Sequence, residues 1–234
     1  MISIFKKEFK NYFRTPIGYV FLAPFIYLAA QQFCLQLMNV TVITMEYIFS
    51  AVNMLCLFIV PVLTMQILSE ERAKKTDQLL LTAPVSVWDI ILGKFLAAYA
   101  VFGIGCVITF IFPAVFSALG TPIWSELIGQ YIGFILLWGA FISVGLFVSS
   151  CTESQVVSAI LTFVALFVLY NIDAFTSGIT TGWGRTVINW FSIMNRQQDF
   201  YSGLLNLPDI VYFFSFIGIF LFLAKRNTEA RRYK

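Results

Sequence analysis

Residues 127–148 read LIGQYIGFILLWGAFISVGLFV, an apolar run without a single charged side chain. An α-helix needs about 20 mostly apolar residues to cross the roughly 30 Å hydrocarbon core of a bilayer. A surface helix of a soluble domain would instead carry charged residues along one face. This stretch therefore predicts a membrane-spanning helix.

Five further stretches qualify, or nearly qualify, as spans. They are residues 17–37, 47–68, 90–119, 155–170 and 208–224. The last two are short for a span. Residues 90–119 are long and contain Gly103, Gly105 and Pro113, which favour a tilt, a kink or a break. We expect an all-α integral membrane protein with six transmembrane helices and one transmembrane domain over residues 1–234.

The composition agrees with this fold class and limits the chemistry. Of the 234 residues, 59% are hydrophobic and 12% are charged, about half the charged share of a soluble domain. Histidine is absent, which excludes His-based metal sites and Ser-His or Cys-His catalysis. The four cysteines stand singly in or beside apolar runs, which predicts buried, inert thiols. We expect no catalytic residue and no metal site in this chain.

Positive charge is distributed unevenly between the two sides of a six-span arrangement. Thirteen of the fifteen basic residues fall on one side, and only Arg185 and Arg196 fall on the other. Because basic residues are enriched on the cytoplasmic side, both termini are expected in the cytoplasm. The thirteen are Lys6, Lys7, Lys10, Arg14, Arg72, Lys74, Lys75, Lys94, Lys225, Arg226, Arg231, Arg232 and Lys234.

Two segments outside the spans carry their own patterns. In residues 1–15 apolar and basic side chains occupy neighbouring arcs of a helical wheel, which predicts an amphipathic helix in the membrane interface. A frayed basic tail is the alternative.

Residues 171–207 contain Trp183, Trp190 and Phe191 among small polar residues. Such aromatic residues settle at headgroup level. They predict one or two short helices at the outer leaflet, with a simple loop as the alternative.

The connection at residues 69–89 reads SEERAKKTDQLLLTAPVSVWD and mixes charges of both signs with a short apolar ridge. Pro84 ends any helix before it, because proline disfavours helix in the preceding residue and cannot continue the hydrogen-bond ladder. Ser86 followed by Asp89 is typical of a helix N-terminus. The pattern predicts a helix, a sharp turn and a second helix entering the membrane. A solvated, charge-balanced loop is equally compatible with it.

The run SEERxxxTxxLLLTxPVS, from Ser69 to Ser86, and the following IILGKFLA at residues 90–97 resemble the second-span connection of ABC-2 type permeases. Residues 199–213, DFYSGLLNLPDIVYF, resemble the same family and are closest to its bacterial subgroup of gliding-motility permeases. The similarity extends over essentially the whole chain. One departure is Lys75, where the family usually has glycine, and this lysine predicts a more regular helix at that turn.

The resemblance implies a permease subunit of an ATP-driven exporter in the bacterial cytoplasmic membrane. It implies a separate ATPase subunit that carries ATP and Mg, and a second permease copy or homologue. A further subunit with an extracellular domain fits the same resemblance, whereas no cofactor in this chain and no nucleic-acid partner are expected. The implied ATPase contacts are Lys6, Lys7, Lys10, Glu70, Glu71, Arg72 and Thr76. The outer gate would include Trp183, Trp190 and Phe191.

The residues themselves bear on the source of energy. No phosphate-binding G-x-x-x-x-G-K-[ST] loop is present, so ATP binding is expected in another chain. The middles of the spans carry no Asp, Glu, Lys or Arg, and gradient-driven carriers normally use such groups. Asp89 and Lys94 lie at span ends, where solvation is expected to be cheap. A secondary transporter or channel, and a non-transporting membrane anchor for an ATPase, remain alternatives.

A few polar residues lie inside the predicted spans. Gln32, Gln36 and Asn53 are candidates for lining a substrate pathway. The alternative is that these side chains form hydrogen bonds between helices. The 26 phenylalanines suit an amphiphilic substrate, although phenylalanine is also ordinary on lipid-facing surfaces.

Overall fold

The computed structural model describes residues 1–39, 45–75, 85–119, 123–173 and 192–232, and within these ranges the elements are helices. They are α1 (Ile2–Arg14), α2 (Ile17–Asn39), α3 (Glu46–Thr64), α4 (Ser69–Ala73), α6 (Val87–Thr109), α7 (Ile111–Leu119), α8 (Trp124–Cys151), α9 (Gln155–Tyr170), α12 (Ile193–Tyr201) and α13 (Leu207–Arg232).

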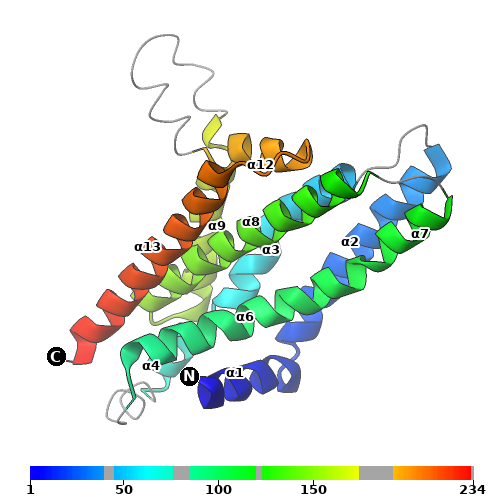
Figure 1. Cartoon of the computed structure of the whole chain (residues 1–234). Coiled ribbons are helices and arrows are strands. Elements are labelled where there is room, and N and C mark those ends of the chain that lie inside the picture. The colour runs from blue at the N-terminus through cyan, green and yellow to red at the C-terminus, as the bar shows by residue number, and fades with distance from the viewer. Residues whose placement is uncertain (40–44, 76–84, 120–122, 174–191, 233–234) are drawn as a thin grey trace.

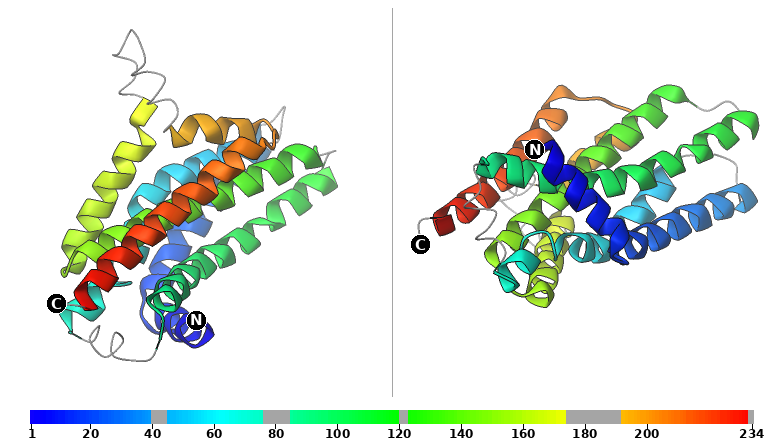
Figure 2. Two further views of the ribbon diagram at one scale, coloured as in Figure 1. Left: turned by 60° about the vertical axis from the view of Figure 1, so that its left-hand side comes forward. Right: turned by 90° about the horizontal axis from the view of Figure 1, so that it is seen from below.

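The long helices run side by side in one slanted bundle (Figure 1). α1, α4 and both chain termini lie at one end of this bundle, which we call the termini end. α12 lies at the opposite end, which we call the α12 end. Figure 2 shows α1 crossing the direction of α2 and α6, rather than running along it.

Five helical stretches are long and apolar enough to cross a membrane. They are Ile17–Met38, Glu46–Ala73, Val87–Ala118, Trp124–Cys151 and Leu207–Ala230. α9 is apolar but has 16 residues, or about 24 Å at 1.5 Å per residue, which is short for a 30 Å core. The multi-pass, all-helical architecture follows from these observations, and a sixth span at α9 stays a prediction.

The expected irregularity in residues 90–119 is a break. α6 ends at Thr109 and α7 begins at Ile111. Pro113 has no N–H to donate to the Thr109 carbonyl four residues earlier. The hydroxyl of Tyr131, on α8, donates to that carbonyl instead at 2.9 Å. The neighbouring helix therefore satisfies the acceptor that the proline leaves open, and the break is held in place.

α8 is the central helix, packing against α3, α6, α9, α12 and α13. Its Trp138 is fully buried in an aromatic cluster contributed by several helices. The indole stacks on Phe102 of α6 at 4.8 Å between ring centroids, and it meets Phe21 and Phe25 of α2 edge-on at 5.9 and 5.5 Å. Aromatic pairs in these geometries add to the stabilisation from burial. This cluster joins α2, α6 and α8 in one core.

Large apolar side chains are exposed along α2, α9 and α13. In a membrane-spanning bundle such surfaces face lipid or another protein chain, where apolar groups carry no solvation cost.

The cysteines are likewise divided between buried and exposed positions. Cys56 and Cys106 are buried, but Cys34 and Cys151 are exposed. The expectation of four buried thiols is therefore wrong for two of them, because cysteines in apolar helices also occur on outward faces.

Candidate functional site

Lys94 is the centre of a charged cluster at the termini end. It lies about two turns into α6, and only 1% of its side chain is exposed. Its Nζ donates to the Ile67 carbonyl at 2.7 Å and lies 2.9 Å from Glu71 Oε1 and 3.3 Å from Glu8 Oε1. Burial of an ammonium group is tolerated only with such partners. The expectation that Lys94 is solvated is therefore wrong, because two other helices cover it.

Lys7 completes this group of charges. Its Nζ is 3.6 Å from Glu8 Oε1 and 3.7 Å from Glu71 Oε1. The resulting Lys94 cluster (Lys7, Glu8, Glu71 and Lys94) has two cations and two carboxylates, contributed by α1, α4 and α6. The Lys7 side chain is 66% exposed, whereas Glu8 and Glu71 are 12% and 16% exposed. One edge of an otherwise covered cluster is therefore open to a partner.

Close packing holds α1 against α6. A Cβ on Gly93 would lie 3.1 Å from Cγ2 and 3.2 Å from Cβ of Ile4, so the absence of a side chain at Gly93 permits the helices to cross closely. Both residues therefore hold α1 against α6: Gly93 permits the two helices to approach closely, and Lys94 pairs with an acidic residue of α1. Farther along α1, the buried Tyr12 hydroxyl donates to the Leu63 carbonyl of α3 at 3.1 Å. Burial raises the pKa of Tyr12, and the negative charge of Glu8 raises it further.

α4 is fixed against α8 through a serine. The Ser149 hydroxyl accepts hydrogen bonds from the backbone N–H groups of Leu68 and Ser69, at 3.1 and 3.2 Å. These N–H groups have no partner within α4, as expected at a helix N-terminus. The helix ends at Ala73, and Lys75 adopts a φ of 55°. The expectation of a more regular helix at Lys75 is wrong, because this lysine takes the left-handed conformation that glycine adopts most readily.

The second half of the connection begins as its sequence indicates. Ser86 is the N-cap of α6, and its hydroxyl accepts from the Trp88 backbone N–H at 3.3 Å. Asp89 lies in the first turn, where a negative charge is favoured by the helix dipole. The predicted helix start after Pro84 is therefore confirmed, and it fixes where Lys94 enters the bundle.

The other residues predicted to contact an ATPase have different environments. Lys6 and Lys10 are exposed on α1, and Glu70 pairs with Lys74 at 2.6 Å. Arg72 is buried, at 7% exposure, and so presents little of its side chain to a partner. Thr76 lies outside the described residues, as do the predicted gate residues Trp183, Trp190 and Phe191.

Sequence reasoning missed Glu8 and misjudged Lys94. A signal was present for both. Glu8 is the one acidic residue in the basic segment 1–15, and Lys94 belongs to the IILGKFLA string. In the structure Glu8 lies 3.3 Å from buried Lys94 and 3.6 Å from Lys7 of its own helix.

The candidate pathway residues lie on two helices, α2 and α3. Gln36 is buried and Gln32 half-buried on α2. Asn53 of α3 accepts from the Trp138 indole N–H at 3.0 Å and donates to the Tyr201 hydroxyl at 2.8 Å. Asn53 therefore forms hydrogen bonds between helices and connects the central core to α12. Burial raises the pKa of Tyr201, although the hydrogen bond from Asn53 opposes this rise.

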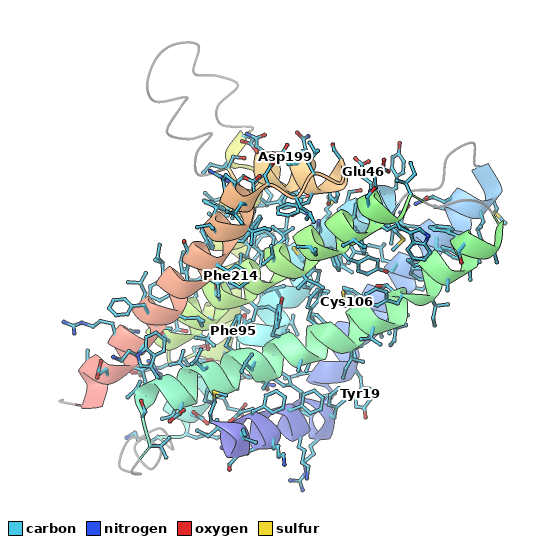
Figure 3. The ribbon with its side chains drawn as sticks, viewed as in Figure 1. Tyr19, Glu46, Phe95, Cys106, Asp199 and Phe214 are labelled. Carbon is cyan, nitrogen blue, oxygen red and sulfur yellow. The ribbon has the colours of Figure 1, made fainter. Side chains whose placement is uncertain are left out.

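The α12 end has a charged contact of its own. Arg196 Nη1 of α12 is 2.7 Å from Asp209 Oδ1 in the first turn of α13, and Asp209 is buried. The Arg196 guanidinium also lies 4.3 Å from the centre of the Tyr212 ring. Together with the Asn53–Tyr201 bond, this pair holds α12 against the spans. Figure 3 shows Asp199 of α12 and Glu46 of α3 at this same end.

In the described part of the chain, no group of three or more Cys, Asp or Glu side chains is placed to hold a metal ion.

The comparisons with known proteins point to a family. Residues 2–183 match the sequence model described as ABC-2 family transporter protein. A comparison with curated proteins finds no match.

Proposed function

The chain belongs to the ABC-2 family of transporter proteins, and we propose that it is the permease subunit of an ATP-driven exporter whose ATPase is a separate chain. The family consists of membrane transport components that are not themselves catalytic. ATP and Mg are accordingly assigned to the partner ATPase. The termini end is assigned to the cytoplasmic side of a bacterial cytoplasmic membrane, in agreement with the distribution of basic residues.

The observation that carries this proposal is the Lys94 cluster. It connects α4 and α1 to a transmembrane helix through ion pairs of 2.9 and 3.3 Å around one buried ammonium group. Charges that are mostly shielded from water interact more strongly than charges on an open surface. If an ATPase displaces α4 or α1, these ion pairs would therefore move α6 together with them. Coupling of this kind can be carried by a contiguous set of packed and paired side chains, and the cluster forms one.

The ATPase contact itself is assigned to the exposed rim of this cluster. Glu70, Lys6 and Lys7 are accessible there, and Glu71 lies directly beneath Lys7. Closure of the ATPase on ATP would press on this rim and tilt the spans. The outer segment at residues 171–207 would line or gate the exit, and two copies of the permease or a homologue would form the pathway. An amphiphilic substrate and membership of the gliding-motility subgroup are parts of the same proposal.

Reversal of the charge at Glu70 tests the contact. Glu70 forms an exposed pair with Lys74 four residues later, so its loss affects stability by only about 0.3–0.5 kcal/mol. Glu229 is a matched control, because it forms the same kind of pair with Lys225 on α13 at the same end. Substitution of Glu71 is less suitable, since it leaves buried Lys94 without a partner.

The measurement is co-purification of a nucleotide-binding subunit with the natively expressed chain in mild detergent. We expect the ATPase to accompany wild type and Glu229→Arg, and to fall at least tenfold with Glu70→Arg. Equal recovery with all three chains would place the contact elsewhere. Absence of an ATPase from wild type would contradict the exporter proposal.

Transport in liposomes then separates a permease from the alternatives. We expect efflux of a fluorescent amphiphilic dye that requires both the ATPase and ATP. Flux without the ATPase would favour a channel or secondary transporter. An ATPase that binds without any flux, across dyes of differing charge, would favour a membrane anchor.

A further inference from the structure

A groove of about 640 Å³ lies on the outward side of α1. Two aromatic residues, Phe9 and Phe13, line one part of it, and two basic residues, Lys10 and Arg14, line the other. Phe9 and Phe13 pack partly against the core and against each other, with ring centroids 5.2 Å apart. The groove thus has an apolar wall that is fixed by the fold and a cationic wall beside it.

The two cations of this groove are not neutralised within the described part of the chain. Lys10 and Arg14 are exposed, lie one turn apart and form no ion pair with a described residue. The acidic residue of the same helix, Glu8, is directed to the opposite side, toward buried Lys94. α1 is therefore divided into a side with balanced charge, facing α6, and an outward side with unbalanced positive charge.

The groove also lies where the spans end. α1 crosses the direction of α2 and α6 at the termini end (Figure 2). Tyr19, in the first turn of α2, is 60% exposed, and its ring meets the Phe13 ring edge-on at 5.7 Å. Figure 3 shows Tyr19 at the corner between α1 and α2. Exposed tyrosines at span ends settle at headgroup level, so the groove is at the depth of lipid headgroups.

We propose that this groove binds one anionic phospholipid. Arg14 and Lys10 would hold the headgroup phosphate through charge-assisted hydrogen bonds, and Phe9 and Phe13 would contact the glycerol and the first acyl carbons. An anion joined to an apolar chain matches both walls of the groove, whereas a soluble anion would use only the basic wall. The proposal assigns Lys10 to lipid rather than to the ATPase and is independent of the proposed ATPase contact.

The experiment compares lipid adducts by native mass spectrometry on delipidated full-length chain. Dioleoyl phosphatidylglycerol and dioleoyl phosphatidylcholine serve as the probes. The variant Lys10→Ala/Arg14→Ala removes both cations from the groove. The control Lys6→Ala/Arg226→Ala removes one lysine and one arginine from other exposed positions at the same end.

We expect wild type and the control to bind the first phosphatidylglycerol more tightly than phosphatidylcholine. A basic residue near an anionic surface contributes about fivefold to affinity, so loss of both should lower the phosphatidylglycerol affinity about twenty-five-fold. The affinity for phosphatidylcholine should be unchanged. The preference should also weaken at high ionic strength, since exposed charges are screened.

Three results would overturn the proposal. One is equal loss of phosphatidylglycerol binding in the groove variant and the control, which would indicate general attraction to a basic surface. Another is full competition by millimolar glycerol 3-phosphate, which would indicate a site for a soluble anion. The third is unchanged phosphatidylglycerol binding in the groove variant; a loss of ATPase co-purification in the same variant would then return Lys10 to the ATPase contact. An unchanged unfolding temperature verifies that the variant is folded.

Discussion

The two ends of the bundle are held together by different interactions. At the termini end, Lys94 is surrounded by Glu8, Glu71 and a backbone carbonyl, and the exposed Lys7 lies at the edge of the group. At the α12 end, hydrogen bonds through Asn53 and through the carboxylate of Asp173 join the helices, and Arg196 pairs with Asp209. A four-charge cluster with an open edge can respond to the charges of a partner. The carboxylates of Asp173 and Asp209 both bind side chains of α12 or of its N-cap residue, and this favours a fixed position for a helix that closes the bundle.

Among these substitutions, Lys94→Met should lower the stability of the protein most. It leaves the carboxylates of Glu8 and Glu71 mostly buried and without their central cation. Removal of one partner of a buried pair costs about 3–5 kcal/mol. We expect a strongly lowered unfolding temperature in detergent, and loss of the co-purifying ATPase. Lys225→Met is the control: it breaks a half-buried pair with Glu229 and a contact with the Trp88 ring but leaves no deeply buried carboxylate, and it should lower stability much less.

Rescue distinguishes charge from packing at this site. The triple variant Lys94→Met, Glu8→Gln, Glu71→Gln should recover most of the lost stability, because no buried charge remains unpaired. Recovery of stability without recovery of ATPase binding would show that these charges are needed for the ATPase contact and not only for folding. If the triple variant is as unstable as the single one, the packing of Lys94 matters more than its charge.

Arg196→Met should have a smaller effect, confined to the α12 end. Arg196 pairs with Asp209 at 2.7 Å, and its side chain is 19% exposed. We expect a loss of about 2 kcal/mol, below the range for a fully buried pair. Hydrogen exchange should increase in α12 and the start of α13, while ATPase co-purification stays as in wild type. Loss of the ATPase in this variant would contradict the functional division between the two ends.

Tyr12→Phe tests the anchor of α1 at the termini end. The substitution leaves the Leu63 carbonyl without its donor, which costs about 1 kcal/mol. Because burial raises the pKa of Tyr12 above its ordinary value of 10.0, the folded state favours the protonated hydroxyl. The stabilisation that the protonated Tyr12 hydroxyl provides is therefore fully present below pH 10 and declines as the pH rises above that value. The difference in unfolding temperature between wild type and Tyr12→Phe should therefore shrink above pH 10. A constant difference would contradict this assignment.

Lys75→Gly should have the smallest effect, and it should be favourable. A non-glycine residue in the left-handed region costs about 1 kcal/mol, and Lys75 has a φ of 55°. We expect a slightly raised unfolding temperature without a change in ATPase co-purification. Lys74→Gly, one residue earlier in the helical region, is the control and should lower stability. A stabilising effect of both substitutions would indicate that the backbone conformation is not the cause.

Much of the helical architecture follows from local sequence. Charge-free apolar runs predict the long helices, Pro113 predicts an irregularity before Leu119, and Ser86 with Asp89 predicts the start of α6. These features depend on the residues within one or two turns, and the sequence displays them directly. The site was predicted less completely. The resemblance implies that Glu71 and Lys7 serve the same contact, and they lie 3.7 Å apart. The sequence pattern, however, places Lys94, the residue that joins the cluster, in solvent.

The amino-acid sequence alone is enough to indicate a chain that crosses a membrane several times and belongs with the ABC-2 family. Those properties depend on composition, periodicity and short motifs. The burial of Lys94 between Glu8 and Glu71, residues 86 and 23 positions away in the chain, is visible only in the folded structure. Whether a charge is solvated or paired depends on which helices cross above it. That crossing is set by packing at Gly93 and Tyr12, which no local pattern reveals.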